Sequence, residues 1–519
     1  MNGPRLLVFL PLGAALGLLH CVGDTPIAIV GPDSGSPSDS GGGDTNPTGD
    51  AADAALPSGT VEWVQVFTTD ETGDLVSDAA HVAIAADGTI LVEGHFAGPT
   101  QFGTLALVPT GSGANVFATK LDRTGKVVWA KDFGNLGAIL PAAIAANDGS
   151  DAYVGLQTGG GTVTVDGISA QDNTAGGFGC SMFKLGAADG KAQWAYAFGA
   201  SASTSTVFMD GIAVHGTTVG VATRFNGKVQ IVGPSSTVLT STSVGQDGLV
   251  TLHDDAQSGK IPHYGVMGGA GADEVTSIAA DSSGAFYIAG SFASGISPLG
   301  LTIANGGTQN TFVAKVDSNV AKVWAQNLTG AAPTTNTGNP LAIATDGAGN
   351  VYLAGGLWGY TTFGAPIPST ASAGGEDGFL AQVLATDGTV KYARAIGGTS
   401  DDEAQAIAAG PGGYVAVAGN YTSSGVTIGS TALPAPQPAR PAAFVARAAG
   451  AGTYTWAKGA AAPNSADFVK AGGVAIDPND GSVVVAGTFS GQIDLGDGKM
   501  RPSSSAGAHQ AFYVMKIAP

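Results

Sequence analysis

Acidic residues recur in this chain just before alanine-rich segments. They are Asp273 and Glu274 before one such segment, Asp401, Asp402 and Glu403 before another, and Asp78 at a similar place earlier in the chain. Carboxylates that converge from several segments can bind a hard cation such as calcium, which takes several oxygen ligands. An Asp side chain can instead accept hydrogen bonds from backbone N–H groups in its own turn. We therefore predict that these residues lie at a common rim, where they either bind calcium or another ligand, or cap their turns.

Other patterns that could support chemistry are absent from the sequence. The seven histidines form no H-E-x-x-H motif, and neither a G-x-S-x-G elbow nor a nucleotide-binding fingerprint is present. His253 lies beside Asp254 and Asp255 in an expected hairpin turn, where we expect it to be solvated. The six Trp and 11 Tyr residues fit strand packing better than a sugar-binding platform. We predict no catalytic residue and no resident cofactor, with calcium as the one ion that the acidic pattern would suit.

Composition indicates an all-β protein that does not bind nucleic acid. The 519 residues include 82 Gly, only 12% are charged, and no long run shows helical periodicity between capping residues. The formal net charge of -19 would repel a polyphosphate backbone. Nucleic acid is therefore an unsuitable partner.

The N-terminus reads as an export signal. Arg5 precedes an apolar run from Leu6 to Leu19, which is too short for a transmembrane helix and suits a signal peptide over residues 1–20. The run ends at Cys21 and so resembles a bacterial lipoprotein signal, which implies that Cys21 is lipidated. In that class a small residue usually precedes the cysteine, whereas here it is His20. Ordinary cleavage nearby is the alternative, which would leave a periplasmic or secreted protein.

Residues 21–59 are predicted to form a disordered tether because they are rich in Gly, Ser, Pro and Asp and nearly devoid of large apolar residues. No Lys or Arg occurs between Arg5 and Lys120, so only an acyl anchor would hold this segment to a membrane. If Cys21 is acylated, the second cysteine, Cys180, has no disulfide partner. We expect Cys180 to be a small buried hydrophobe within a strand.

Residues 60–519 form an array of long repeats. Each unit contains a short Ala/Ile segment, an Asp/Asn/Gly turn, an apolar strand ending in Ala-Gly, and a final hairpin such as FATKLDRTGKVVWAKDFG at 117–134. The aromatic residue of the fourth strand marks the period, at Trp63, Trp129, Trp194, Tyr264, Trp324, Tyr392 and Trp456. Seven units of four strands predict a seven-bladed β-propeller. The Ala-rich first strand should lie innermost, where a blade is narrowest.

The two ends of the array are complementary. The folded part begins with a strand of the fourth type, VEWVQVF at 61–67, and ends with a strand of the third type, AFYVMKI at 511–517. Pairing these two strands would complete the last blade and remove exposed sheet edges. We therefore predict a closed ring and a monomer.

Two elements, GGAGADEVTSIAADSSGAFYIAGSF at 268–292 and GGTSDDEAQAIAA at 397–409, resemble the bacterial SBBP-type seven-bladed propeller repeat. That repeat combines Gly-Gly, an acidic pair, an Ala-rich strand, an Asp/Gly turn and a Y-[VIL]-A-G strand. The similarity extends over 61–519 and is weakest in the second and third blades, where regularity is lost around Asp210 to Gly216. The resemblance implies an exported protein, often a lipoprotein, in a class whose members mostly have no assigned activity.

A second resemblance is confined to LDRTGKVVW at 121–129, which is similar to the docking motif that links neighbouring blades in quinoprotein-like propellers. Lipoprotein members of that class scaffold outer-membrane assembly. Only one unit of this chain carries the full string.

These patterns favour a cell-envelope binding or scaffold module without enzymatic activity, located at the outer membrane or cell surface, with a protein or a glycan as partner. Two alternatives stay open. One is a polysaccharide-directed lyase or hydrolase with channel carboxylates as acid and base. The other is a quinoprotein-like propeller that assists outer-membrane assembly. A fold alone does not decide between them.

Overall fold

The computed structural model describes residues 56–519 apart from 69–79, 110–114, 135–139, 173–177, 201–204, 233–236, 241–244, 294, 303–309, 329–341, 347, 362–369 and 504–509. The predicted signal peptide, Cys21, the tether up to residue 55 and Asp78 lie outside the described residues. The propeller belongs to a compact unit that spans Ala55–Pro519.

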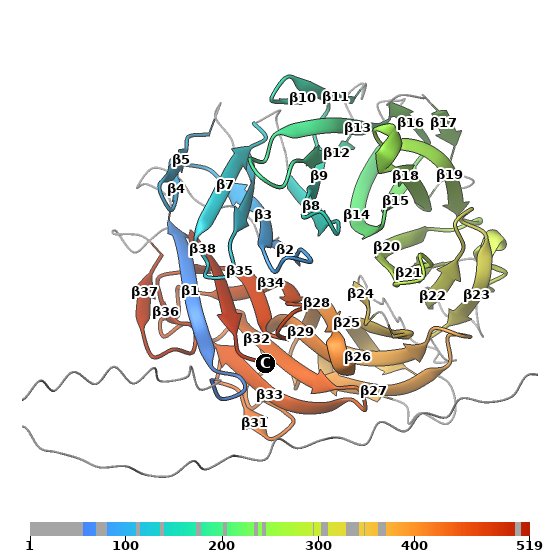
Figure 1. Ribbon diagram of the computed structural model, residues 1–519. Helices are drawn as coiled ribbons and strands as arrows, with labels where there is room; N and C mark the ends of the chain where they lie inside the picture. The colour runs from blue at the N-terminus through green and yellow to red at the C-terminus, as the bar shows by residue number, and fades with distance from the viewer. Residues whose placement is uncertain are drawn as a thin grey trace, which may run out of the picture. The chain divides into compact units, whose positions relative to one another are not determined.

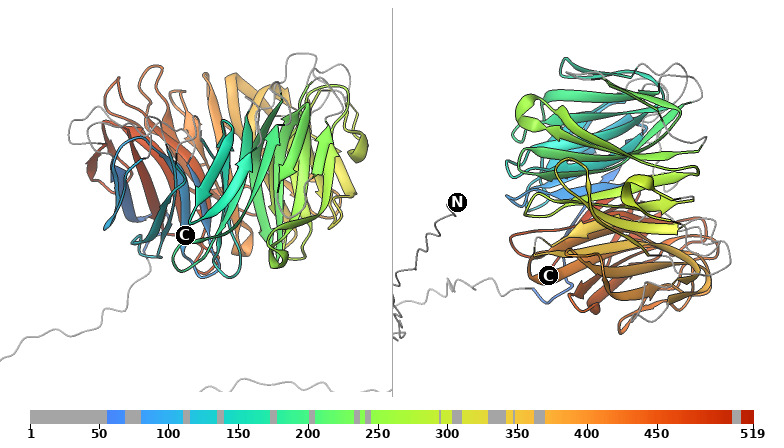
Figure 2. Two further views of the ribbon diagram at one scale, coloured as in Figure 1. Left: turned by 90° about the horizontal axis from the view of Figure 1, so that it is seen from above. Right: turned by 90° about the vertical axis from the view of Figure 1, so that its right-hand side faces the viewer.

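Seven antiparallel sheets, each built on four strands, stand around a central axis (Figures 1 and 2), which confirms the predicted all-β propeller. The inner strands are β2 (His81–Ile84), β8 (Leu140–Ala146), β14 (Thr206–His215), β20 (Asp273–Ala280), β24 (Ala342–Thr345), β28 (Asp402–Gly410) and β34 (Val469–Ile476). The second strands are β3 (Ile90–Phe96), β9 (Ala152–Thr158), β15 (Thr218–Asn226), β21 (Phe286–Phe292), β25 (Asn350–Thr361), β29 (Tyr414–Tyr421) and β35 (Val483–Ser490).

The third strands are β6 (Asn115–Leu121), β12 (Gly179–Leu185), β18 (Asp247–Asp254), β22 (Asn310–Val316), β26 (Thr370–Leu384), β32 (Ala442–Ala449) and β38 (Gln510–Ile517). The outer strands are β7 (Val127–Asp132), β13 (Ala192–Ala200), β19 (Lys260–Met267), β23 (Lys322–Asn327), β27 (Val390–Ile396), β33 (Thr453–Ala460) and β1 (Val61–Thr68). The turns between strands one and two and between three and four lie on one face, the turn face. The connections between strands two and three and between blades lie on the other, the loop face.

Short hairpins decorate the blades, and three 3-10 turns complete the described elements. The hairpins are β4 (Thr100–Phe102) with β5 (Leu105–Leu107), β10 (Gly161–Val165) with β11 (Ile168–Asp172), β16 (Lys228–Val232) with β17 (Thr237–Thr240), β30 (Thr427–Ile428) with β31 (Thr431–Ala432), and β36 (Gln492–Asp494) with β37 (Met500–Pro502). The 3-10 turns are η1 (Asp255–Gln257), η2 (Ser297–Leu299) and η3 (Pro411–Gly413). Among the described residues, no helix combines the length and the hydropathy needed to cross a lipid bilayer.

The chain ends close the ring as predicted. β1 pairs with β38 from Val61 opposite Ile517 to Thr68 opposite Ala511. Two further hydrogen bonds extend this ladder, from the Gly59 N–H to the Ala518 carbonyl (3.0 Å) and from the Ala518 N–H to the Thr60 carbonyl (2.8 Å). The closing blade therefore has a complete outer strand, and β38 is not an exposed edge.

Neighbouring blades are joined by an aromatic side chain of the outer strand, which packs against a glycine in the next blade. In six of the seven interfaces this glycine has a positive φ, and its missing side chain leaves room for the ring. The pairs are Trp63–Gly125, Trp129–Gly190, Trp194–Gly259, Trp324–Gly388, Tyr392–Gly452 and Trp456–Gly59. In the last pair, Gly59 at the start of the folded chain takes the place of a turn glycine. A contact between neighbouring blades, which the single copy of LDRTGKVVW suggested, therefore recurs around most of the ring.

The seventh interface, between the third and fourth blades, corrects one of the aromatic residues that were predicted to mark the repeat. Trp129 lies opposite Lys120 and Trp324 opposite Lys315, but the residue at this register in the third blade is His263, opposite Leu252. Tyr264, which we took as the aromatic marker, is one residue later and is exposed. The glycine of the next blade is also replaced here, because Val320 adopts a φ of 61° and lies against Gly265. The aromatic residue and the turn glycine are thus lost together.

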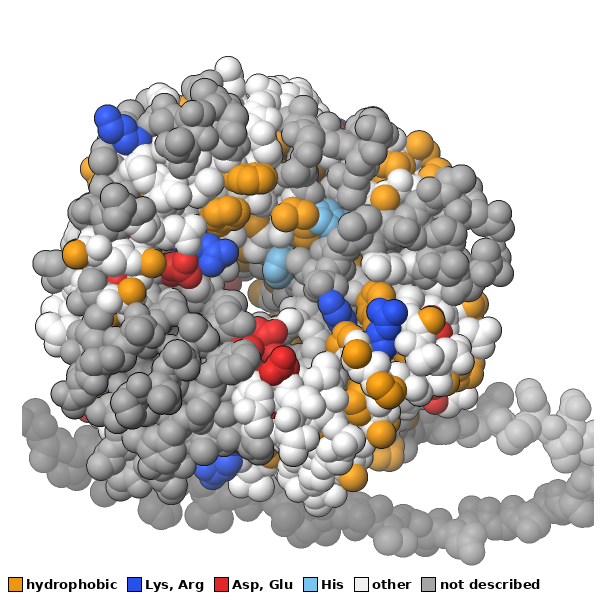
Figure 3. Space-filling view, turned by 180° about the vertical axis from the view of Figure 1, so that it is seen from behind, with side chains coloured by type: hydrophobic (Ala, Val, Ile, Leu, Met, Phe, Trp, Pro, Cys, Tyr) orange, Lys and Arg blue, Asp and Glu red, His pale blue; other side chains and the backbone are white. Residues whose placement is uncertain are grey.

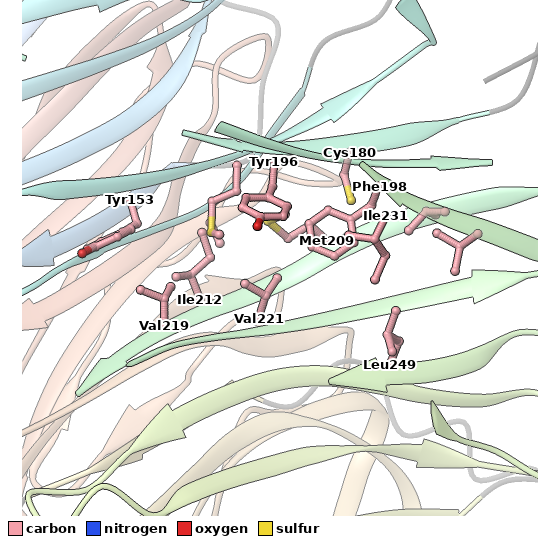
Figure 4. Packing of buried hydrophobic residues seen from close by; sticks show 14 of the residues in the cluster. Tyr153, Cys180, Tyr196, Phe198, Met209, Ile212, Val219, Val221, Ile231 and Leu249 are labelled. Atoms are coloured by element: carbon pink, nitrogen blue, oxygen red, sulfur yellow. The ribbon is translucent and has the colours of Figure 1, made fainter. Parts of the chain in front are cut away.

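The hydrophobic core lies between the blades. Figure 4 shows Cys180, Tyr196 and Phe198 of the second blade directed toward Ile212, Val221 and Leu249 of the third. Cys180 is fully buried, as predicted. His253 is also fully buried, so the prediction that it is solvated was wrong. β18 continues past this residue, and its ring nitrogens lie 2.9 Å from Thr251 Oγ1 and 3.0 Å from the Gly259 carbonyl oxygen.

Candidate functional site

All seven inner strands line a cavity of about 540 Å3 on the propeller axis. Much of its wall consists of small or aliphatic residues such as Ala143, Gly211, Ile343 and Ala406. This arrangement confirms that the Ala-rich strand lies innermost. Any polar side chain on this wall therefore departs from the general pattern and is a candidate for function.

A bulge near the start of the inner strand adds one residue toward the channel in five blades. The register skips one residue at the same place in each of these strands. The skipped residues are Ala142, Asp210, Thr276, Gln405 and Gly472, and all five line the channel. Because a bulge residue is not paired in the ladder, its side chain can be directed away from the sheet. Asp210 is the one charged residue of this described set.

The position two residues before the bulge lies nearer the loop face and forms a rim. In the same five blades it holds Leu140, Phe208, Glu274, Glu403 and Lys470. The predicted residues Glu274 and Glu403 therefore occupy equivalent places, but the rim is a mixture of apolar, acidic and basic side chains. Within the described ranges, no group of three or more His, Cys, Asp or Glu residues is placed to hold a metal ion. Figure 3 shows acidic, basic, histidine and hydrophobic side chains together around the middle of this face.

The predicted aspartates accept hydrogen bonds from backbone N–H groups. Asp402 is buried, and its carboxylate accepts hydrogen bonds from the N–H groups of Gly398 (2.7 Å), Thr422 (2.9 Å) and Ser423 (3.0 Å). The equivalent Asp273 accepts one from the Ala293 N–H at 3.0 Å. The exposed Asp401 accepts one from the Glu376 N–H at 3.1 Å. All three aspartates are therefore bound by backbone N–H groups, and most of these groups lie outside the aspartates' own turns.

We expect Asp402→Ala to lower the free energy of unfolding by about 3 kcal/mol, because it leaves three N–H groups without their acceptor. Asp401→Ala, which removes a single hydrogen bond at an exposed residue, should cost about 1 kcal/mol or less. Urea denaturation of both variants measures the difference. Calcium should leave the melting temperature of the wild type unchanged, and a calcium-dependent rise that Asp402→Ala abolishes would favour an ion site instead.

Arg224 joins two carboxylates at the mouth of the channel. It lies opposite Phe208 in the β14–β15 ladder, and its guanidinium nitrogens are 3.5 Å from Asp210 Oδ1 and 3.4 Å from Glu274 Oε2. Asp210 and Arg224 belong to the third blade and Glu274 to the fourth. Asp210 Oδ2 and Arg224 Nε have no hydrogen-bond partner among the described residues. The cluster is therefore only partly satisfied within the described part of the protein.

The pKa of Asp210 is raised to about 7, chiefly by burial, with Arg224 opposing the shift and the Glu274 carboxylate adding to it. The side chain is 13% exposed, so water reaches it only in part. At neutral pH, Asp210 thus exchanges between a neutral acid that can donate a hydrogen bond and a carboxylate that can only accept.

This shift predicts a pH-dependent stability. Between its ordinary pKa of 3.8 and about 7, Asp210 retains a proton in the folded state that the unfolded chain releases. The contribution of Asp210 to the free energy of unfolding should therefore fall as pH rises through this range, by at most about 1.4 kcal/mol per pH unit. Asp210→Asn should remove this slope, and denaturation curves between pH 4 and 8 measure it. Asp148→Asn, at an exposed turn, is the control, and equal slopes in both variants would contradict the prediction.

Two phenylalanines adjoin the charged cluster. The Arg224 guanidinium lies 5.2 Å from the centroid of the Phe208 ring, and Phe208 stacks on Phe178 with centroids 6.1 Å apart and planes inclined by 27°. Phe178 precedes β12, and the Val207 N–H donates to its carbonyl at 2.9 Å. Its side chain is 44% exposed, which is unusual for an aromatic residue in this protein. The mouth therefore combines an accessible aromatic ring with hydrogen-bonding groups.

A second polar pair lies on the channel wall of the first blade. His81 lines the channel, and its Nδ1 atom is 3.4 Å from Oε2 of the fully buried Glu93. Burial lowers the pKa of His81 to about 4 and raises the pKa of Glu93 well above its ordinary value. His81 is thus neutral near pH 7, and burial favours the protonated form of Glu93. In the other six blades the residues at these two positions are Ala, Gly or Ser.

Sequence reasoning did not find Asp210, Arg224, Phe178 or the His81–Glu93 pair. The strands that carry Asp210 and Arg224 lie where the repeat pattern weakens, and Glu274 comes from the next blade. One signal was available. Asp210 is an acidic residue two positions after the rim residue Phe208, and Thr276 holds the same position after Glu274. This equivalence is recognisable only once the bulge is known.

Comparisons with known proteins give a likeness of fold. No family model matches the chain, and no curated protein matches it in sequence. A chain of the mitotic checkpoint complex has 10% identity and a TM-score of 0.42, with 95% of this chain and 99% of that chain covered. The quinohemoprotein alcohol dehydrogenase of Comamonas testosteroni has 11% identity, covers 87% and 76%, and has a TM-score of 0.37. A protein of unknown function from Dyadobacter fermentans has 9% identity, covers 89% and 100%, and has a TM-score of 0.39.

Proposed function

We propose that this protein is an exported, SBBP-type propeller of the bacterial cell envelope that binds a protein or a glycan without transforming it. Lipid on Cys21 holds it at the outer membrane or cell surface, and the segment from residue 22 to about residue 55 acts as the tether. The binding role is supported by one observation above all. Charged and hydrogen-bonding side chains gather at one mouth of a channel whose wall is otherwise mostly Ala, Gly and Ile.

The position of the chain's entry into the propeller agrees with this role. Gly59 takes the place of a turn glycine against Trp456, so the chain enters the propeller on the turn face. Glu274 and Arg224 are at the loop-face ends of their strands. The described chain therefore enters the propeller on the face opposite to the polar mouth.

The anchor is tested by expressing the full chain and Cys21→Ser in a diderm bacterium supplied with an alkyne fatty acid. The wild type should incorporate the label and sediment with outer membranes, whereas Cys21→Ser should do neither. A wild-type chain that stays unlabelled and soluble would contradict the lipid anchor without bearing on the binding role.

The binding role is tested with the full chain carrying an affinity tag between residues 40 and 50. Detergent-treated envelopes of the source cells are passed over wild type, over Arg224→Ala with Glu403→Ala, and over the turn-face control Asp189→Ala. We expect a protein or a glycan to be retained by the wild type and the control and lost by the double variant. Retention of nothing, or equal retention by all three, would contradict binding at this mouth.

A second candidate is a polysaccharide lyase or hydrolase, and the Arg224 cluster is the observation that favours it. Asp210, whose pKa is raised, and Glu274 contact one guanidinium, and carboxyl groups with different environments can divide the roles of acid and base. The assay incubates the protein with polysaccharides at pH 5–8 and measures new reducing ends and unsaturated products. Activity that Asp210→Asn abolishes would establish this candidate in place of the first.

A further inference from the structure

Resting on the binding role proposed above, we propose that the ligand of the mouth is a neutral saccharide. A pyranose ring packs on the exposed side of Phe178, and hydroxyl groups bind to Arg224, Glu274 and Asp210. The binding site is thus the part of the channel mouth that the third blade forms together with Glu274 of the fourth.

The charged trio is not required by the propeller fold. The residues equivalent to Arg224 in the other blades are His95, Gln157, Ser291, Gly356, Asn420 and Thr488, none of which is Lys or Arg. The residues equivalent to Asp210 are Ala142, Thr276, Gln405 and Gly472 in the blades where the bulge is described. The same architecture therefore forms with small or neutral residues at both positions. A partly buried charged cluster carries a desolvation cost, so its presence where the third and fourth blades meet, at positions that the fold fills elsewhere with small or neutral residues, points to a ligand.

The hydrogen-bonding capacity of the trio fits hydroxyl groups. Arg224 only donates, an ionised Glu274 only accepts, and Asp210 does either near neutral pH. A hydroxyl group donates and accepts at once, so neighbouring hydroxyls of a sugar can bind a guanidinium and a carboxylate together. The ion pairs at 3.4 and 3.5 Å are longer than good charge-assisted hydrogen bonds, and the three side chains remain partly exposed. Each side chain therefore retains capacity for an incoming group.

Charge selects against ionic ligands at this site. A strongly anionic polysaccharide would meet Glu274 and a protein of net charge -19. A cationic group would compete with Arg224, which already neutralises the carboxylates. A neutral ligand avoids both penalties, and one apolar ring face beside hydroxyl-binding groups matches the two-sided polarity of a pyranose.

The exposed aromatic surface also favours a saccharide over a protein. Phe178 stacks on Phe208, which in turn lies beside Arg224, so the stack connects the accessible ring to the polar groups. A stable protein interface usually buries about 800 Å2 on each partner around several apolar anchors. Leu140 and Phe178 are the large hydrophobic residues that the described rim exposes near this mouth. That surface suits a ligand of a few sugar rings.

The test is affinity electrophoresis of the full chain, with Cys21→Ser for solubility, through native gels that contain neutral dextran, xyloglucan, glucomannan or mixed-linkage β-glucan, or anionic polygalacturonate. At least one neutral polymer should retard the protein, and polygalacturonate should not. Phe178→Ala and Arg224→Ala should each raise the dissociation constant at least tenfold. Met500→Ala, which truncates an exposed hydrophobic residue on a distant hairpin, should leave it unchanged.

The melting temperature shows separately whether the variants fold. Because Phe178→Ala alters an exposed side chain, it should retain the wild-type melting temperature within about 2 °C. Absence of retardation by any neutral polymer, or retardation that Phe178→Ala does not weaken, overturns the saccharide proposal. If envelope proteins are captured in an Arg224-dependent manner while no polymer binds, the binding role stands and the saccharide is excluded. If neither binds, the binding role fails as well.

Discussion

Removal of residues 1–68 is expected to destroy the cooperative fold of the propeller. β1 is the outer strand of the seventh blade, and it covers β38 with Val64, Val66 and Phe67 while its Trp63 packs on Gly125 of the first blade. Phe67 also contacts Phe102 and Phe512, with ring centroids 4.9 and 6.4 Å apart. Loss of these contacts should cost more than about 5 kcal/mol, since one buried Phe alone contributes about 3 kcal/mol or more. The measurement is the melting temperature, with near-UV circular dichroism for tertiary packing.

Two controls distinguish the effect of opening the ring from the effect of shortening the chain. Removal of residues 1–54 should leave the melting temperature unchanged, because the compact unit begins at Ala55. Moving residues 56–68 to follow Pro519 through a short Gly-containing turn should restore the wild-type value, since Gly59 and Ala518 are already hydrogen-bonded neighbours. A chain that lacks 1–68 and yet melts as the wild type does would show that ring closure contributes little.

Gly388→Ala is expected to lower the free energy of unfolding by about 3 kcal/mol. Gly388 has a φ of 75°, and a Cβ atom there would lie 2.6 Å from the Trp324 ring. The substitution adds backbone strain of about 1 kcal/mol to steric overlap of about 1–3 kcal/mol. Gly167→Ala provides a matched control, because this glycine has a φ of 83° and nothing lies within 4 Å of the added Cβ. Its expected cost is about 1 kcal/mol, from backbone strain alone.

A double-mutant cycle shows whether the contact between Trp324 and Gly388 causes the difference in cost between Gly388→Ala and Gly167→Ala. In a Trp324→Ala background only the overlap with Gln326 Cγ remains, which also lies 2.6 Å from the added Cβ and belongs to a flexible side chain, so Gly388→Ala should cost less than it does in the wild type. Trp324→Ala itself should destabilise, because the indole N–H donates to the Ala385 carbonyl of the next blade at 2.9 Å. Equal costs for Gly388→Ala in both backgrounds would mean that the aromatic–glycine contact does not hold neighbouring blades together.

The architecture was predictable because the signals for it repeat. Seven copies of one pattern reinforce one another, and the position of Trp63 and of the last strand predicted the closing pair without any knowledge of contacts. The error at Tyr264 arose in the blade where the aromatic residue is lost. His253 was misjudged because Asp254 and Asp255 read as a turn, whereas β18 extends to Asp254 and η1 makes the turn.

The candidate site was not predictable for the opposite reason, since its residues depart from the repeat. Alternation along a strand cannot reveal a bulge, and the bulge turns Asp210 into the channel. Arg224 and Glu274 are 50 residues apart and meet only because neighbouring blades pack together. Glu274 and Glu403 occupy equivalent places in their blades, but the contacts of Asp273 and Asp402 depend on loop N–H groups that no spacing rule locates.

The closing strand also determines how the protein responds to mechanical load. The residues before Gly59 continue directly into β1, so tension on the N-terminal segment reaches the β1–β38 ladder before any other part of the propeller. If a ligand is held at the loop face, the pull runs along the strand, and the hydrogen bonds of the ladder share the force in parallel instead of opening one after another. The strand that completes the ring is therefore also the one that bears the force.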